Sequence, residues 1–203
     1  MAPVSETVAA ALPLAAGERD RARAAGDRTL VAAARRGDQL ALEQLFRRHW
    51  PRAYRVALLV TRDHGAAEDV AQEAFVTAVR RLDRFDRRRP FAPWLTRIVT
   101  NRAIDWTRAR GVRREVGAAV VPEPAASAPA DDAPPGALAC SEQLLRALAV
   151  LTPEQRAVVV LRHLLDCTPG EIARALELPR GTVNSRLRRG LDLLARELEG
   201  ERR

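Results

Sequence analysis

The sequence predicts an all-α protein built from two small helical domains joined by a flexible linker. Apolar residues recur at three- and four-residue spacing, two Thr-Pro sequences resemble helix capping boxes, and a Pro/Ala-rich segment separates the two helical regions. No strand pattern, internal repeat or Gly-rich phosphate loop is evident. We divide the chain into a disordered tail (1–27), a first domain (28–114), a linker (115–137) and a second domain (138–203).

The charge of the chain favours a polyanionic partner. The 203 residues suffice for one or two small domains, carry a net charge of +8, and use arginine for all 34 basic positions. Between residues 28 and 114 the basic residues outnumber the acidic ones by about two to one. Nucleic acid is the partner that this excess suits best.

The cysteines and the termini suggest neither a disulfide framework nor a targeting signal. Cys140 and Cys167 are too few for such a framework. His163 lies four residues before Cys167, but further ligands are lacking nearby, so we expect ordinary packing and no metal or cofactor. The N-terminus has no basic region before its apolar residues, and no apolar run is long enough to span a bilayer. We therefore expect a cytoplasmic protein.

The first domain begins near Arg28, after an alanine-rich stretch without apolar periodicity. Residues 30–46 are spaced for amphipathic helices, with an interruption at Gly37-Asp38. An apolar surface continues through residues 50–60, and residues 61–65 form a turn.

Residues 66–82 form the clearest helix of this half. Its predicted buried stripe consists of Val70, Ala71, Ala74, Phe75, Ala78, Val79 and Leu82. A second stripe contains Asp69, Gln72 and Glu73, and continues to Val76. A polar stripe of this kind is either a solvated face or a docking surface for a partner helix.

Residues 84–94 form a loop in which arginine and aromatic residues alternate. Arg87, Arg88 and Arg89 precede Pro90, with Phe85, Phe91 and Trp94 around them. Basic residues interleaved with rings suit single-stranded nucleic acid, because arginine attracts phosphates and rings stack on exposed bases. The alternative is that the rings belong to the core and the arginines are solvated.

The next helix, residues 94–110, carries a second candidate surface for nucleic acid. Leu95, Val99 and Trp106 share one face. Arg97, Asn101 and Arg108 lie with Ile104 on another, at spacings of four and three residues. Three further arginines extend this charge at Arg110, Arg113 and Arg114.

The composition changes abruptly in the linker, whose proline and alanine residues predict a segment that spans rather than packs. The second domain starts with a helix at 141–151, followed by the capping box of Thr152, Pro153, Glu154 and Gln155. With the two helices that follow, we expect a four-helix domain.

Residues 168–194 predict a helix-turn-helix. The first helix starts with the capping box at Thr168-Pro169-Gly170-Glu171, and Pro179 breaks it. The second repeats apolar residues at Val183, Leu187, Leu191 and Leu194, and turns Arg, Ser, Thr and Asn side chains outward. Such a face suits the major groove of DNA. The alternative is a helical hairpin with a solvated basic face.

Three separated stretches resemble a known family. They are EDVAQEAF (68–75), RFDRRRPFAPWLTRIVTNRAIDW, and LTPEQRAVVVLRHLLDCTPGEIARALELPRGTVNSRLRRG. In this order and spacing they resemble the extracytoplasmic-function (ECF, group 4) sigma factors of the sigma-70 family of bacterial RNA polymerase. The resemblance covers about residues 30–199; the first domain is similar to sigma domain 2 and the second to sigma domain 4.

The resemblance implies a promoter-specificity factor that binds core RNA polymerase, recognises the −35 and −10 elements and helps melt the −10 region. Asp69, Gln72 and Glu73 match the surface that docks on the β′ clamp helices, which favours docking over a solvated face. The second domain would dock on the β flap. An anti-sigma factor is implied as a further partner.

The resemblance also implies two DNA-binding sets. The loop captures a flipped base of the −10 element, and Asn101 lines the pocket. The −10 set is Phe85, Arg87, Arg88, Arg89, Phe91, Trp94, Arg97, Asn101 and Arg108. The −35 set lies on the second helix of the helix-turn-helix: Arg180, Thr182, Asn184, Ser185, Arg186, Arg188 and Arg189.

Two departures from the family leave the promoter sequence open. Arg87-Arg88-Arg89-Pro90 stands where relatives often have Gly, Asp and Ser, which puts the identity of the captured base in doubt. Asn184 and Arg188 stand at positions that vary between relatives. The rival interpretation is an autonomous helix-turn-helix regulator that binds duplex operators without polymerase. A nucleic-acid enzyme would need paired carboxylates or metal ligands, which the sequence lacks, so we expect no enzymatic activity.

Overall fold

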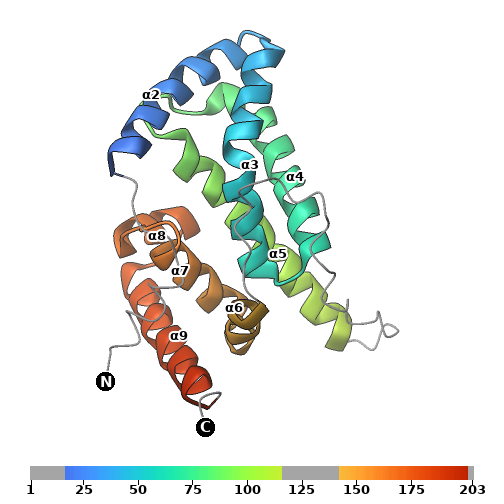
Figure 1. The fold of residues 1–203 in the computed structure, drawn as a ribbon, viewed down its shortest axis with the longest axis vertical. Coiled ribbons are helices and arrows are strands. Elements are labelled where there is room, and N and C mark those ends of the chain that lie inside the picture. The colour runs from blue at the N-terminus through green and yellow to red at the C-terminus, as the bar shows by residue number, and fades with distance from the viewer. Residues whose placement is uncertain (1–16, 116–141, 201–203) are drawn as a thin grey trace.

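The computed structural model describes residues 17–115 and 142–200, and within these ranges all regular structure is helical (Figure 1). The first bundle consists of α2 (Gly17–Ala34), α3 (Gln39–Thr61), α4 (His64–Arg81), the 3-10 turn η1 (Leu82–Arg84) and α5 (Phe91–Glu115). The second consists of α6 (Glu142–Ala147), η2 (Leu148–Val150), α7 (Pro153–His163), α8 (Pro169–Leu176) and α9 (Arg180–Gly200). The predicted all-α fold is confirmed. Apart from its first residue, the predicted linker lies outside the described residues.

Helix α2 begins at Gly17, ahead of the boundary predicted near residue 28. Asp27, which we had assigned to the disordered tail, is only 2% exposed. Its Oδ1 accepts a hydrogen bond of 2.8 Å from Arg48 Nη1, and its Oδ2 lies 3.0 Å from His49 Nε2. The tail prediction is therefore wrong for residues 17–27. A buried polar contact with α3 helps hold the end of this segment, and apolar periodicity does not reveal such a contact.

The two predicted interruptions of the first domain are confirmed, and an aspartate caps the helix that follows each of them. Gly37, with φ 91°, makes the turn after α2, and Asp38 Oδ1 accepts a 3.0 Å hydrogen bond from the backbone of Ala41. After α3, Asp63 Oδ1 accepts a 3.0 Å hydrogen bond from the backbone of Ala66. The chain therefore folds back into antiparallel helices whose apolar stripes share one core.

The second bundle is organised by both predicted capping boxes. At each helix start the threonine hydroxyl, of Thr152 or Thr168, accepts from the third helical residue, whose side chain accepts in return from the threonine backbone. Helix α9 lies close against α7, since a Cβ added to Gly190 would lie 3.1 Å from a methyl group of Val159. Within residues 142–200 the second bundle contains four α-helices, the number that the sequence predicts.

The two bundles pack directly against each other and are not held together by the linker alone. Leu59 of α3 lies in the core of the second bundle, and Ala157 of α7 lies in that of the first. Between them, the buried guanidinium of Arg156 donates to the carbonyl oxygens of Val60, Leu148 and Leu151. Burial, together with the nearby charge of Arg62, lowers the pKa of Arg156 to about 10, so it remains charged at neutral pH.

Replacing Asp27 with Asn should lower the free energy of unfolding by about 1–3 kcal/mol at neutral pH, because a buried charge-assisted contact is lost. Burial alone would raise the pKa of Asp27, but the hydrogen bonds and charges of His49 and Arg48 outweigh it and lower that pKa. The stabilisation is therefore present above the ordinary Asp pKa of about 4 and is lost as the pH falls below it.

The stabilisation by Asp27 is measured by urea unfolding of wild type and Asp27→Asn at neutral pH and at about pH 3. The difference between the two proteins should shrink at the lower pH. Asp192→Asn, on an exposed position of α9, is the control. If the free energies of unfolding of the two proteins differ equally at both pH values, the ionised Asp27 carboxylate is not the source of the stabilisation.

Candidate polymerase and nucleic-acid interfaces

The polar stripe of α4 is exposed at Asp69, Gln72 and Glu73. Gln72 Nε2 donates a 3.2 Å hydrogen bond to Glu68 Oε1, and Glu73 lies 3.6 Å from Arg102 of α5. The opposite side of α4 is buried in the first core. The stripe is thus an acidic ridge on a rigid helix.

Two exposed valines continue this ridge toward the C-terminal end of α4. Val76 is 49% exposed and Val79 is 43% exposed. Val79 was predicted to be buried, and this part of the prediction is wrong. A surface that combines acidic and exposed apolar side chains is more typical of a protein-binding site than of a face that contacts only solvent.

The aromatic residues around the loop belong to the core. This corrects the expectation that Phe85 and Phe91 contact the −10 DNA. Phe85 and Phe91 are 6% and 4% exposed, and Trp94 is half-buried. The ring centroids of Phe85 and Trp94 lie 4.7 Å apart, and those of His49 and Phe91 lie 5.1 Å apart. Phe85 and Phe91 are therefore not free to stack on a base in this structure. They anchor the two ends of the loop at residues 85–90, which we call the specificity loop after the loop that the family resemblance implies.

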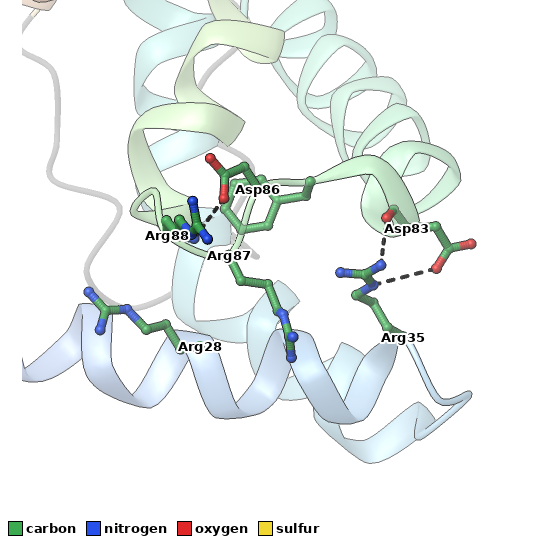
Figure 2. Close-up of a pocket in the computed structure, with 7 residues that line it drawn as sticks. Arg28, Arg35, Asp83, Asp86, Arg87 and Arg88 are labelled. Carbon is green, nitrogen blue, oxygen red and sulfur yellow. Dashed lines mark hydrogen bonds and ion pairs between the residues drawn. The ribbon is translucent and has the colours of Figure 1, made fainter.

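The arginines of the specificity loop remain exposed beside a hollow of about 770 Å³ (Figure 2). The hollow is lined by Arg28, Arg35, Asp83, Phe85, Asp86, Arg87 and Arg88. Arg28 lies on α2 and Arg35 directly follows that helix, and Figure 2 shows that Arg87 extends from the loop toward α2. Asn101, expected to line a pocket here, is not among these residues.

The walls of this hollow are held by polar contacts. Arg35 Nη2 donates a 2.6 Å hydrogen bond to the carbonyl oxygen of Asp83, and Asp86 Oδ1 accepts a 3.0 Å bond from the backbone of Arg88. Sequence reasoning did not single out Arg28 or Arg35. The available signal was that they are seven residues apart, about two helical turns.

On the α5 face formed by Arg97, Asn101 and Arg108, both arginines are paired with residues of the second bundle. Arg97 forms an ion pair and hydrogen bond with Glu177, and Arg108 Nε donates a 2.7 Å hydrogen bond to Glu154 Oε1. Both glutamates belong to the second bundle. Burial raises the pKa of Glu154, but hydrogen bonding, chiefly from Arg108, outweighs it and lowers that pKa, so its carboxylate is ionised.

The apolar stripe of α9 faces the second core as the sequence predicts, except that Leu191 is only half-buried. Val183, Leu187 and Leu194 lie in the second core. The outward residues are exposed at Arg180, Asn184, Arg188 and Arg189, and half-exposed at Thr182, Ser185 and Arg186. This basic face is available to a groove of duplex DNA, with helix α8 packed behind it.

His163 and Cys167 are both half-buried. Burial raises the pKa of the Cys167 thiol, which favours the protonated form. Within residues 17–115 and 142–200 no group of three or more His, Cys, Asp or Glu side chains is placed to hold a metal ion. Over the same ranges, no helix is long and apolar enough to cross a membrane.

Known protein families match the two bundles separately. The Sigma-70 region 2 family matches residues 45–113, and the Sigma-70 region 4 family matches residues 141–194. The ECF RNA polymerase sigma factor SigM of Mycobacterium tuberculosis is 36% identical over 177 residues, which cover 85% of this chain and 84% of that protein. The chain belongs to the ECF RNA polymerase sigma factors.

Other proteins similar to this sigma factor support the same family assignment. SigE of Mycolicibacterium smegmatis is 36% identical over 162 residues, which cover 76% of this chain but only 61% of that protein. CnrH, solved with the cytosolic domain of CnrY, is 29% identical with a TM-score of 0.63, covering 86% of this chain and 98% of that one. RpoE of Bartonella quintana, solved with the anti-sigma factor NepR, is 25% identical with a TM-score of 0.63, covering 77% and 96%.

As a sigma factor, the protein gives RNA polymerase its promoter specificity, and its family consists of transcription initiation factors. The rival interpretation, an autonomous operator-binding regulator, is not favoured. A helix-turn-helix alone would serve such a regulator, whereas the region 2 match covers residues 45–113 of the first bundle, from within α3 to near the end of α5.

Phe91→Ala should destabilise the protein by about 3–5 kcal/mol, because a buried aromatic side chain leaves a cavity. Arg88→Ala, on the exposed part of the same loop, should change stability by less than about 0.5 kcal/mol. Chemical denaturation of both variants measures the difference. Unchanged stability of Phe91→Ala would mean that the ring is not part of the core.

Proposed function

We propose that this sigma factor binds core RNA polymerase through the α4 ridge, reads the −35 element with α9, and holds the unpaired −10 strand with the specificity loop and the α5 face. The distribution of exposed charge supports this division: acid lies on α4, and arginine on the loop and α9. An acidic ridge would be repelled by DNA, and arginine-rich faces attract it.

The α4 ridge fits a helical protein partner. Asp69, Gln72 and Glu73 share its outer side, and Val76 supplies apolar area at one end. The partner that the family resemblance suggests is the pair of β′ clamp helices, and basic side chains on such a partner would complement the carboxylates. On the same resemblance, the second bundle would bind the β flap.

The hollow beneath the specificity loop suits a flipped nucleotide of the −10 element. Arg28 and Arg87 can bind the phosphates on either side, while Asp86 can accept a hydrogen bond from an exocyclic amino group. Extruding a base costs a few kcal/mol, and binding in the hollow offsets that cost, which favours the melted state. Asn101 would contact the same strand on its way along α5.

The α9 face would read the −35 element in the major groove. Arg188 and Arg189 can each donate two hydrogen bonds to guanine, and Asn184 can pair with adenine. Thr182 and Arg180, near the start of the helix, would contact the phosphates that border the groove. No reaction is catalysed by the sigma factor itself in this proposal, because melting is driven by binding.

Two further aspects concern location and control. The protein would act in the cytoplasm, where bacterial RNA polymerase transcribes the chromosome. An anti-sigma factor is a proposed partner, since RpoE of Bartonella quintana, similar over 77% of this chain, was solved with the anti-sigma factor NepR.

The triple change Asp69→Ala, Gln72→Ala and Glu73→Ala should leave the fold intact and weaken binding to core polymerase by at least tenfold, or about 1.4 kcal/mol. Gel filtration and fluorescence titration with core polymerase measure this. The double change Asp192→Ala/Glu197→Ala removes the same negative charge from α9 and is the control. Equal affinities for both variants would refute the docking assignment.

Arg189→Ala should weaken holoenzyme binding to duplex −35 DNA, since a good bidentate contact contributes about 1–3 kcal/mol of discrimination. Asn101→Ala should spare that binding and reduce open-complex formation, seen as permanganate reactivity of the −10 region. Both assays use a promoter selected in vitro from randomised templates. A premelted −10 region should not fully rescue Asn101→Ala. If both variants fail the duplex assay equally, the two-surface division is wrong.

A further inference from the structure

One segment of the first bundle contacts both ends of the specificity loop. It consists of residues 27–35, the last part of α2 and the residue that follows it, and we call it the support segment. Arg35 Nη2 donates its 2.6 Å hydrogen bond to the carbonyl oxygen of Asp83, two residues before the loop begins (Figure 2). Arg35 Nε also lies 3.8 Å from the Asp83 carboxylate. The first end of the loop is therefore held by the support segment.

The second end of the loop is held through a buried histidine. Asp27 Oδ2 lies 3.0 Å from Nε2 of His49, and the ring centroids of His49 and Phe91 lie 5.1 Å apart. Asp27, His49 and Phe91 are all buried. A buried, hydrogen-bonded ring has little freedom to turn, so Asp27 fixes the surface on which Phe91 packs, directly after the loop.

Between these two contacts the support segment forms one wall of the hollow. Arg28 and Arg35 line the hollow from this segment, and Asp86, Arg87 and Arg88 line it from the loop. Figure 2 shows the loop passing over α2, with Arg87 reaching toward the helix. The spacing between the two walls is therefore determined by how the support segment holds the ends of the loop.

The polar contacts within the loop are local. The backbone N–H of Arg88 donates a 3.0 Å hydrogen bond to Asp86 Oδ1, and that of Arg89 donates a 3.0 Å bond to the carbonyl oxygen of Asp86. These bonds shape the turn but do not attach it to another element. The position of the turn over the hollow thus depends on the contacts at its two ends.

The two arginines of the support segment differ in what they can do. The guanidinium of Arg35 is engaged with Asp83, and its side chain is only 31% exposed. Arg28 is exposed at the hollow, where it can meet a phosphate. Arg35 is therefore suited to positioning the loop, and Arg28 to contacting DNA.

We propose that the support segment positions the specificity loop, and that Arg35 and Asp27 thereby determine how strongly the −10 site discriminates between bases. Neither residue needs to touch DNA, because donors and acceptors on the loop distinguish bases only when they are held in place. The segment lies before residue 45, where the region 2 match begins. The inference rests on the proposed function of the hollow in capturing a base of the −10 element.

The first test measures the order of the loop in the free, full-length protein. Arg35→Ala should raise the amide hydrogen-exchange rates of residues 85–89 by roughly threefold to tenfold, while α4 and α9 exchange as in wild type. Arg36→Ala removes the same charge from the next position, which is exposed, and is the control. Equal exchange rates of the loop in both variants would overturn the positioning role.

The second test measures base discrimination by the holoenzyme. A promoter selected in vitro supplies a premelted template, and each position of its −10 element is changed to the other three bases in turn. The captured base is the one at which Arg87→Ala loses its preference. At that position Arg35→Ala should reduce a preference of roughly tenfold or more to less than about threefold, whereas Arg36→Ala should keep it.

Salt dependence separates positioning from direct attraction of DNA. Arg28→Ala should lower the slope of log affinity against log salt by about 0.7 on the premelted template, because one phosphate contact is lost. Arg35→Ala should keep the slope of Arg36→Ala while it loses base preference. If the slope of Arg35→Ala falls as that of Arg28→Ala does, Arg35 binds DNA itself and the positioning role is overturned.

The same measurements distinguish failure of the inference from failure of the proposed −10 site. If Arg87→Ala changes the preference at no position, the hollow is not the −10 site, and the inference falls with it. If Arg87→Ala loses a preference that Arg35→Ala keeps in full, the −10 site stands and the positioning role is overturned.

A second variant tests the other end of the loop. Asp27→Asn weakens the contact with His49 and should also accelerate exchange of residues 85–89 and reduce the preference at the captured base. Val60→Ala truncates a buried side chain near the far end of α3 and is the control for lost stability. If Asp27→Asn and Val60→Ala give equal loop exchange and equal base preference, the contact through His49 does not position the loop, and this half of the proposal is overturned.

Discussion

The contact of α3 with α7 is the constraint on which the arrangement of the whole molecule depends. Leu59 enters the second core, Ala157 enters the first, and Arg156 links Val60 to two carbonyl groups of its own domain. Because interiors are densely packed, this junction determines which side chains of α5 meet the second bundle. The pairing of Arg97 and Arg108 with glutamates follows from it.

Arginine serves two purposes in this chain. On α9 it is displayed to solvent, where it can meet DNA, and on α5 it is paired within the molecule. An arginine that binds a carboxylate uses the same planar donors that bind a phosphate or a base edge. A face built to bind a polyanion is therefore also a face that an acidic element of the same chain can cover.

In the specificity loop, buried residues at the two ends hold exposed residues between them. Phe85 and Phe91 are buried at its two ends and pack with Trp94, while the arginines between them project outward. Loop sequence can change without loss of the fold, since burial of the rings supplies the stability. This separates the residues that position the loop from those that would meet DNA.

The sequence by itself determined the helices, the capping boxes at Thr152 and Thr168, the outward face of α9 and the family, because these depend on local periodicity and short motifs. The burial and pairing of side chains that depend on contacts between distant parts of the chain were decided only by the tertiary structure. It buried Asp27 against α3, moved Phe85 and Phe91 from expected DNA contacts into the core, and exposed Val79. It also paired Arg97 with Glu177, eighty residues away. Helical spacing tells which side chains share a face, but which element covers that face depends on how separate helices pack.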